Sequence, residues 1–506
     1  MTSDAVTKLR DHLATIDDIH GAMAVLGWDE QTKMPRGGAK ARGERMATLG
    51  RMSHEMFISD ETGRLIENAE KDLDGLDFDS DEASLVRFAR REFDRSRVIP
   101  PELLAEAIRA RTAGYQTWVE AKANQDFPAF LPVMEKLLEI NHRFVEAYRT
   151  LDPDADEDYD LLLEGYEPGL TAKEIESVFS VVRERTVPLV EQVKANASKV
   201  DDSILHGNFP QDAQERLSRK VLLQLGFDDD HWRIDETHHP FASSMAIEDI
   251  RITTRYIPEL LGSALFGTMH EFGHGLYERQ VSPSLGRTPL ASGVSMAWHE
   301  SQSRMWENLV GRGRAFWDWG INPLREEFGE TIGGATPDDV YRAVNKLQPS
   351  LIRVEADELT YNLHIILRFE LERDMLNGKV ALKDLPDILN DRMMDYLGVD
   401  VPNVSVGVLQ DVHWSSGLFG YFPTYALGNV LSLMLWDRIN REIPDLDDSF
   451  RSGEFGPLRD WLGENVHSHG SKFLPKDLME RVVGTREFDP QPLVSYLEGK
   501  VNDLYG

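Results

Sequence analysis

The chain of 506 residues contains no cysteine, which excludes disulfide bonds, thiolate catalysis and cysteine-ligated zinc. No apolar run approaches the roughly 18 residues that a membrane-spanning helix requires. The first residues are acidic and amphipathic, and they lack the basic and apolar regions of a secretory signal. We therefore expect a soluble protein of the reducing cytoplasm that has no membrane partner.

Positive charge is also scarce, because 55 Lys and Arg residues stand against 87 Asp and Glu residues, a net charge of −32. Such a surface repels nucleic acid and anionic lipid, and no basic cluster provides a local exception. We therefore expect no nucleic-acid partner. Hydrophobic residues make up 41% of the chain, enough for a large buried core in one domain or two.

Strand-like alternation is rare, and much of the chain has the three-and-four spacing of amphipathic helices. This spacing predicts helices over residues 4–26 and 39–57, separated by a turn-rich break, and further helices over 83–97, 102–123, 130–149, 171–197 and 212–225. Residues 237–245 and 249–256 instead alternate polar with β-branched or aromatic side chains. They predict a small antiparallel sheet along a cleft, whose edge either pairs with an extended peptide or is purely structural.

The most specific local motif is HExxH, formed by His270, Glu271 and His274 in a segment apolar enough for a buried helix. Residues four apart lie one turn above each other on the same helix face, so both imidazoles can bind one ion. In this pattern the two histidines hold zinc, and the glutamate takes a proton from a water molecule. The alternative is a chance match, in which two surface histidines flank a solvated glutamate.

A third zinc ligand is available in the next expected helix, where His299 and Glu300 are adjacent. Adjacent residues lie about 100° apart around a helix, so only one of them can face the ion. Two histidines and a glutamate are the ligands of thermolysin-type zinc sites. We therefore favour Glu300, and His299 remains the alternative.

Hydrolysis at such a site also needs a donor for the oxyanion and a group that positions the substrate. The glycine-rich segment 407–429 offers His413, Tyr421 and Tyr425 as donors, although each is equally well explained as a buried aromatic residue with a satisfied polar atom. Arg353 lies in an expected helix between apolar neighbours, so its guanidinium requires a carboxylate. The residues alone leave open whether that carboxylate is an acid of the chain or belongs to a substrate.

Taken together, these motifs resemble those of the carboxypeptidase Taq family of metallocarboxypeptidases. The resemblance covers nearly the whole chain and rests on seven blocks in a fixed order: 26–35 with Arg42, 239–241, 249–253, 270–274, 299–304, 352–357 and 407–414. Such a series is far more specific than HExxH alone.

The resemblance implies a mainly α-helical single fold over residues 1–506, with a helical half at about 1–230 and a metal- and substrate-binding half at about 231–506. A long central cleft would separate the halves, with the small antiparallel sheet beside the metal. It further implies a homodimer with one Zn²⁺ or Co²⁺ per subunit. The implied activity is release of C-terminal amino acids from peptides with broad specificity.

The resemblance also implies roles for individual residues: metal ligation by His270, His274 and Glu300, general base catalysis by Glu271, binding of the terminal carboxylate by Arg353, oxyanion stabilisation by His413 with Tyr425 rather than Tyr421, and lining of the substrate cleft by His239 and Gln410. The alternative enzyme is a zinc oligopeptidase that cuts short peptides internally. A catalytically silent metal-binding scaffold is disfavoured because Glu271 is present.

Overall fold

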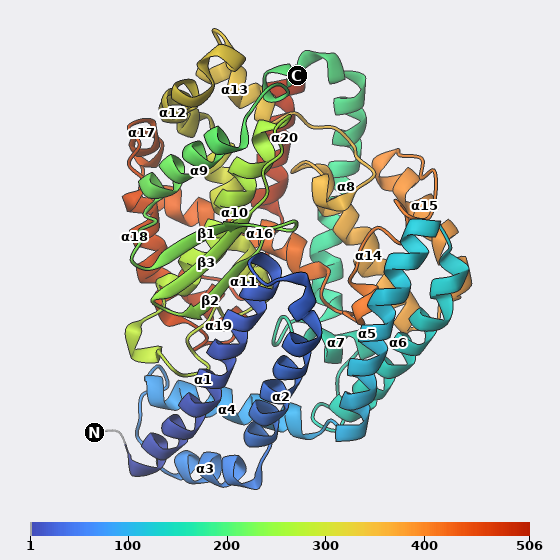
Figure 1. The fold of residues 1–506 in the computed structure, drawn as a ribbon, viewed down its shortest axis with the longest axis vertical. Coiled ribbons are helices and arrows are strands. Elements are labelled where there is room, and N and C mark those ends of the chain that lie inside the picture. The colour runs from blue at the N-terminus through green and yellow to red at the C-terminus, as the bar shows by residue number, and fades with distance from the viewer. Residues whose placement is uncertain (1–2) are drawn as a thin grey trace.

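The computed structural model describes residues 3–506 (Figure 1). Helices form most of the structure, and one three-stranded sheet lies among them. The prediction of a mainly α-helical fold with a small sheet is therefore confirmed.

The chain begins with four helices: α1 Asp4–Thr32, α2 Ala39–Phe57, α3 Asp60–Lys71 and α4 Asp81–Arg97. The predicted bounds of α2 are confirmed. The prediction that α1 ends near residue 26 is wrong, because the helix continues for a further turn and a half. Trp28 in this added part is buried, and the guanidinium groups of Arg233 and Arg251 lie over its ring. Tertiary packing thus overrides the turn-rich sequence.

Five helices follow: α5 Pro101–Asn124, α6 Phe127–Tyr148, α7 Asp158–Leu163, α8 Ala172–Ala195 and α9 Gln211–Leu225. Pro101 is the first residue of α5, where its missing N–H has no intrahelical partner to lose. Thr171 and Glu174 form a capping box at the start of α8. The helices predicted over this part of the chain are confirmed to within about three residues at each end.

The sheet consists of β1 Trp232–Glu236, β2 Ala242–Ala246 and β3 Asp249–Thr254, in the order β1-β3-β2. Strands β2 and β3 are antiparallel, as predicted, but β1 pairs with β3 in parallel. The sheet is therefore mixed, and the prediction of a purely antiparallel sheet is wrong. Strand β1 was not predicted. Its first residue, Trp232, stacks on Phe272 of the helix Leu261–Arg279.

The remaining helices are α10 Leu261–Arg279, α11 Met296–Arg304, α12 Arg314–Ile332, α13 Pro337–Val344, α14 Thr360–Leu376, α15 Leu385–Leu397, α16 Pro423–Glu442, α17 Leu446–Arg451, α18 Gly456–Asn465, α19 Pro475–Val482 and α20 Gln491–Tyr505. A seven-residue π-helix, Met305–Gly311, continues directly from α11. The sheet packs on α10, and α11 packs between α10 and α16 near the centre of the molecule (Figure 1).

The buried apolar side chains form two clusters. The larger runs from Ile99 to Tyr505, and the smaller joins α1, α3 and α4 to residues 247 and 281–290. The larger cluster crosses residue 230, and the division of one domain at about that position stays a prediction. Within residues 3–506, no helix is both long enough and apolar enough to cross a membrane.

A cavity of about 2140 Å³ lies between these elements. Its walls come from α1, α4, α5, β2, α10 and α11, and from the segments around residues 353 and 410–425. Nearly every residue singled out in the sequence lies on this cavity.

Candidate active site

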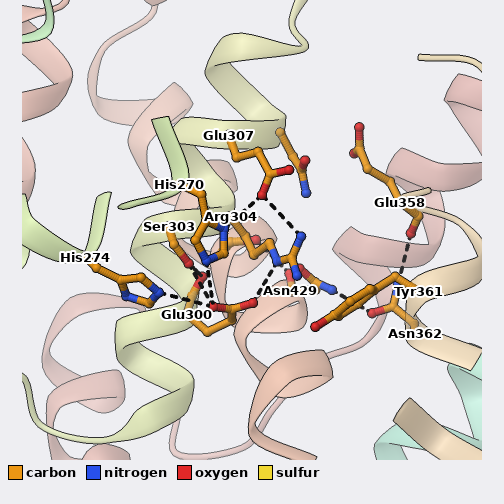
Figure 2. A network of polar contacts seen from close by, with 12 residues as sticks. His270, His274, Glu300, Ser303, Arg304, Glu307, Glu358, Tyr361, Asn362 and Asn429 are labelled. Carbon is orange, nitrogen blue, oxygen red and sulfur yellow. Dashed lines mark hydrogen bonds and ion pairs between the residues drawn. The ribbon is translucent and has the colours of Figure 1, made fainter. Parts of the chain in front are cut away.

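Helices α10 and α11 bring three side chains that could bind a metal ion, His270, His274 and Glu300, to one point, as Figure 2 shows. The Nε2 atoms of His270 and His274 lie 3.6 and 3.5 Å from the same carboxylate oxygen, Oε2 of Glu300. Tetrahedral zinc with bonds of about 2.0–2.2 Å requires ligand atoms about 3.3–3.6 Å apart. The donor atoms and their spacing therefore fit a zinc-like divalent cation, and these three residues would hold it.

Two glycines allow the helices to approach closely enough for this convergence. A Cβ atom on Gly273, which lies between the two histidines of α10, would come within 2.5 Å of the main-chain oxygen of Gln302 in α11. A Cβ atom on Gly428 in α16 would come within 2.6 Å of Cβ of Glu300. Real Cβ atoms do not approach so closely, so Glu300 reaches the histidines only because both positions lack a side chain.

Each candidate ligand is held by a further partner. His270 Nδ1 lies 2.9 Å from Oε2 of Glu307, and His274 Nδ1 lies 3.3 Å from Nδ1 of His299. Arg304 donates from Nε to Oε1 of Glu300 at 2.7 Å. Such contacts fix the ring orientation of metal-binding histidines and leave the other nitrogen for the ion.

The electrostatic environment of the cluster favours a cation. Burial works against charge on His270, but Glu300 and Glu307 raise its pKa to about 9. Burial likewise opposes ionisation of Glu307, yet Arg304 and His270 lower its pKa to about 2. Two carboxylates thus lie against His270, and a cation held there in place of the proton would be favoured by their charge.

Glu271 lies beside the three candidate ligands and is buried. Burial raises its pKa to about 7, and the main-chain N–H of Ala242 in β2 donates to it. A carboxylate with a pKa near neutrality can both take up and release a proton during a reaction. The edge strand of the sheet thus holds the candidate base.

Arg353 lies on the same cavity, in the single 3-10 turn Arg353–Glu355. The expectation of a longer helix with buried flanks is wrong, since Val354 is 58% exposed. Nε of Arg353 donates to Oδ1 of Asp411 at 2.8 Å, and its NH1 group donates to the hydroxyl of Tyr361 at 3.2 Å. An internal ion pair therefore exists, with an acid 58 residues away rather than with Glu355 or Asp357.

The three candidate oxyanion donors also meet on this cavity. His413 Nε2 and the hydroxyl of Tyr425 lie 3.1 Å apart, and the rings of Tyr421 and Tyr425 meet edge to face at 5.3 Å between centroids. Burial lowers the pKa of His413 to about 3, so its imidazole is neutral. Burial and Tyr421 raise the pKa of Tyr425 far above its usual value, so its hydroxyl keeps its proton and can donate it in a hydrogen bond.

The two remaining candidates line the cavity in different ways. His239 is exposed at the cavity wall, and partial desolvation with the charges of Arg255 and Arg353 lowers its pKa. The side chain of Gln410 is bound to the main chain: it accepts from the N–H of Arg353 at 3.0 Å and donates to Val406 at 2.8 Å. Gln410 therefore shapes the loop that carries Arg353.

Comparison with known proteins identifies the family. Residues 8–501 match the family model described as carboxypeptidase Taq (M32) metallopeptidase. The chain belongs to this family. It is 39% identical to thermostable carboxypeptidase 1 of Thermus thermophilus over 96% of this chain and 95% of that protein, and 38% identical to carboxypeptidase 1 of Bacillus subtilis over 98% and 97%.

Solved structures agree with this assignment. The M32 carboxypeptidase from Deinococcus radiodurans R1 superposes with a TM-score of 0.96 at 37% identity, covering 100% of both chains. The Pyrococcus furiosus carboxypeptidase gives a TM-score of 0.94 at 36% identity, covering 99% of each. The family and these names support a metallocarboxypeptidase and do not favour the oligopeptidase alternative.

Sequence reasoning missed two acids of this M32 site. Glu307 contacts His270 because the π-helix after α11 turns its side chain towards the cluster (Figure 2). Glu278, one turn beyond His274 in α10, accepts from Nε2 of His299 at 2.7 Å. Its position four residues after His274 was a usable signal, since that spacing repeats the HExxH face of the helix. The π-helix left no signal in the sequence.

His299 itself lies outside the group of three candidate ligands. Its Nδ1 faces His274 and its Nε2 faces Glu278, so both ring nitrogens are engaged by protein atoms. This arrangement makes His299 a support for His274 and leaves Glu300 as the third candidate ligand.

Proposed function

We propose that this M32 metallocarboxypeptidase releases single residues of broad identity from peptide C-termini, using His270, His274 and Glu300 to hold one Zn²⁺ or Co²⁺ per subunit. The observation that supports this best is that one cavity contains both the three convergent ligands and the buried guanidinium of Arg353. A cation site alone fits any metallopeptidase. A cation site that shares its cavity with a fixed positive group fits a substrate with a free terminal carboxylate.

A divalent ion held by His270, His274 and Glu300 would supply Lewis acidity at the scissile bond. Glu271 takes a proton from the attacking water and delivers it to the departing amine. Its buried position and its pKa of about 7 suit both directions of transfer.

The oxyanion forms beside the tyrosine pair in this proposal. Tyr425 donates from its protonated hydroxyl, and the neutral imidazole of His413, 3.1 Å away, orients that hydroxyl. Tyr421 packs against Tyr425 and is the second candidate donor. A preorganised donor of this kind contributes about 100- to 1000-fold to turnover.

Arg353 binds the terminal carboxylate, and His239 and Gln410 line the cleft around it. Asp411 accepts from Nε of Arg353 and Tyr361 accepts from NH1, which leaves NH2 and the second N–H of NH1 for a substrate. Arginine suits this role because its planar fork matches a carboxylate in geometry.

The test compares a set of peptides with free and amidated C-termini, digested by the zinc- or cobalt-loaded enzyme and read by mass spectrometry. Losing one charge-assisted contact to a buried group should reduce kcat/KM for the amides by about 10- to 150-fold. Products should form ladders from the C-terminus. Internal cuts that ignore amidation would contradict the proposal and support an oligopeptidase.

The same resemblance leads us to propose a homodimer that works in the cytoplasm. The absence of cysteine is consistent with a reducing compartment. Light scattering on the purified protein tests the oligomeric state, since a dimer should give a mass near twice 57.5 kDa.

A further inference from the structure

Two arginines share one carboxylate beneath the cavity. Arg353 donates from Nε to Oδ1 of Asp411 at 2.8 Å, and Arg368 of α14 donates from Nε to Oδ2 at 2.6 Å. Arg353 is 5% exposed and Arg368 1% exposed. Two guanidinium groups therefore face one carboxylate, and the buried group of three carries a net charge of +1.

No neighbouring side chain balances this charge through an ion pair among residues 3–506. The nearby His364 and His413 are neutral because burial lowers the pKa of each to about 3, so they leave the charge of the group at +1. The NH1 group of Arg368 donates to the main-chain oxygen of His364 at 2.7 Å, and its buried NH2 group has no hydrogen-bond partner in the described structure.

Glu372 follows Arg368 by one turn of α14, but its two carboxylate oxygens accept from other groups. Trp414 Nε1 donates to Oε1 at 2.9 Å, and Tyr159 and the main chain of Gly420 donate to Oε2. Burial raises the pKa of Glu372 to about 7. It holds the segment that carries His413 and forms no ion pair with Arg368 in the part of the chain that the structure describes.

Only part of this group reaches the cavity. Arg353 and Asp411 line it, whereas Arg368 lies behind them. If Arg368 were neutral, Asp411 would balance Arg353 and the pair would have no net charge. With Arg368 present, the uncompensated charge is available where Arg353 meets the cavity. Buried positive charge is costly until an anion arrives, so the group favours an anionic ligand.

We propose that Arg368 is a positioning residue for the free C-terminal carboxylate of the substrate, acting through Asp411 on Arg353. Arg368 balances the charge of Asp411. By donating to Oδ2 it also fixes the position of this carboxylate, which in turn orients Arg353 through its Nε. The inference rests on the proposed role of Arg353. It assigns the preference for free carboxylates to a three-residue group rather than to Arg353 alone.

The test measures kcat and KM for matched free-acid and amidated peptides with wild type and Arg368→Met. The variant should raise KM for the free acid by about 10- to 100-fold. The charge of Arg368 lies behind Asp411, but at an effective dielectric constant near 20 it still attracts the carboxylate of the substrate strongly. The KM for the amide and the kcat for both should change little. The ratio of free-acid to amide kcat/KM should therefore fall.

A charge-restoring variant separates electrostatics from packing. Arg368→Met with Asp411→Asn returns the group to a charge of +1, and the Asn oxygen can still accept from Nε of Arg353. Most of the preference for free acids should return. Arg368→Lys keeps the positive charge without the guanidinium, so it should also keep most of the preference for free acids. If Arg368→Met fails to fold, Arg368→Lys is measured in its place.

The matched control is Arg373→Met on the same helix, since Arg373 pairs with Glu157 and Glu176 and is absent from the cavity wall. Its effect should be confined to stability. If Arg368→Met leaves the preference intact, or if the charge-restoring and lysine variants lose it equally, the inference is wrong while the proposed function stands. A wild-type enzyme that ignores amidation would overturn both.

Discussion

We expect His299 to set the tautomer of His274, one of the three proposed metal ligands. Burial opposes the charge of Glu278, but donation from His299 and from Gly293 and Ser292 lowers its pKa, so it is ionised. An ionised carboxylate only accepts hydrogen bonds, so Nε2 of His299 must carry its proton. In a neutral His299 ring, Nδ1 then has no proton and can accept from Nδ1 of His274, which lies 3.3 Å away.

The consequence falls on the other nitrogen of His274. With Nδ1 protonated, Nε2 of the neutral ring presents a lone pair towards Oε2 of Glu300, where the ion would bind. Burial lowers the pKa of His274 to about 4, which keeps the ring neutral. His299→Phe removes the acceptor and leaves the ring free to take the unproductive tautomer.

Loss of such a partner weakens metal binding by about 10- to 100-fold, or about 1.4–2.7 kcal/mol. The change in Zn²⁺ affinity can be measured by letting the metal-free wild type and variants compete with a chromophoric chelator for Zn²⁺ at fixed pH. Glu278→Gln keeps an oxygen acceptor and loses only the charge, so it should weaken binding less than His299→Phe. His206→Gln is the control, since His206 lies on the surface beside Asp202. Wild-type affinity in His299→Phe would refute the reasoning.

Three further predictions concern the base, the helix contact and pH. Glu271→Gln should bind zinc at least as well as wild type while kcat falls by about 100- to 10,000-fold, and equal loss of metal and activity would argue against a base. Gly428→Ala should displace Glu300, costing about 1–3 kcal/mol of stability and lowering zinc affinity in the same chelator assay; an unchanged protein would contradict the close contact. Glu372 has a pKa raised from 4.5 to about 7, so between these values the folded protein keeps a proton that the unfolded chain has lost. Relative to Glu372→Gln, wild type should therefore lose about 3 kcal/mol of stability as pH rises through that window, measured by denaturant unfolding. A difference independent of pH would show that the carboxyl ionises normally.

Several elements could be predicted because their signals are local. Helix α2 was predicted to the residue because apolar spacing is a property of neighbouring positions. The same holds for His270 and His274, since a spacing of four on a helix places both on one face whatever surrounds it. Glu300 followed from the donor chemistry of zinc, and the structure places its Oε2 beside both imidazoles.

The tertiary structure decided which distant groups meet. The parallel pairing of β1 with β3 depends on the path of the chain, and the extension of α1 depends on burial of Trp28. Asp411 pairs with Arg353 across 58 residues and with Arg368 across 43. Sequence alone specifies that a buried guanidinium needs a carboxylate, because desolvation makes an unpaired charge costly, but many acids satisfy that need. Only packing selects one acid, and only packing leaves two arginines to share it.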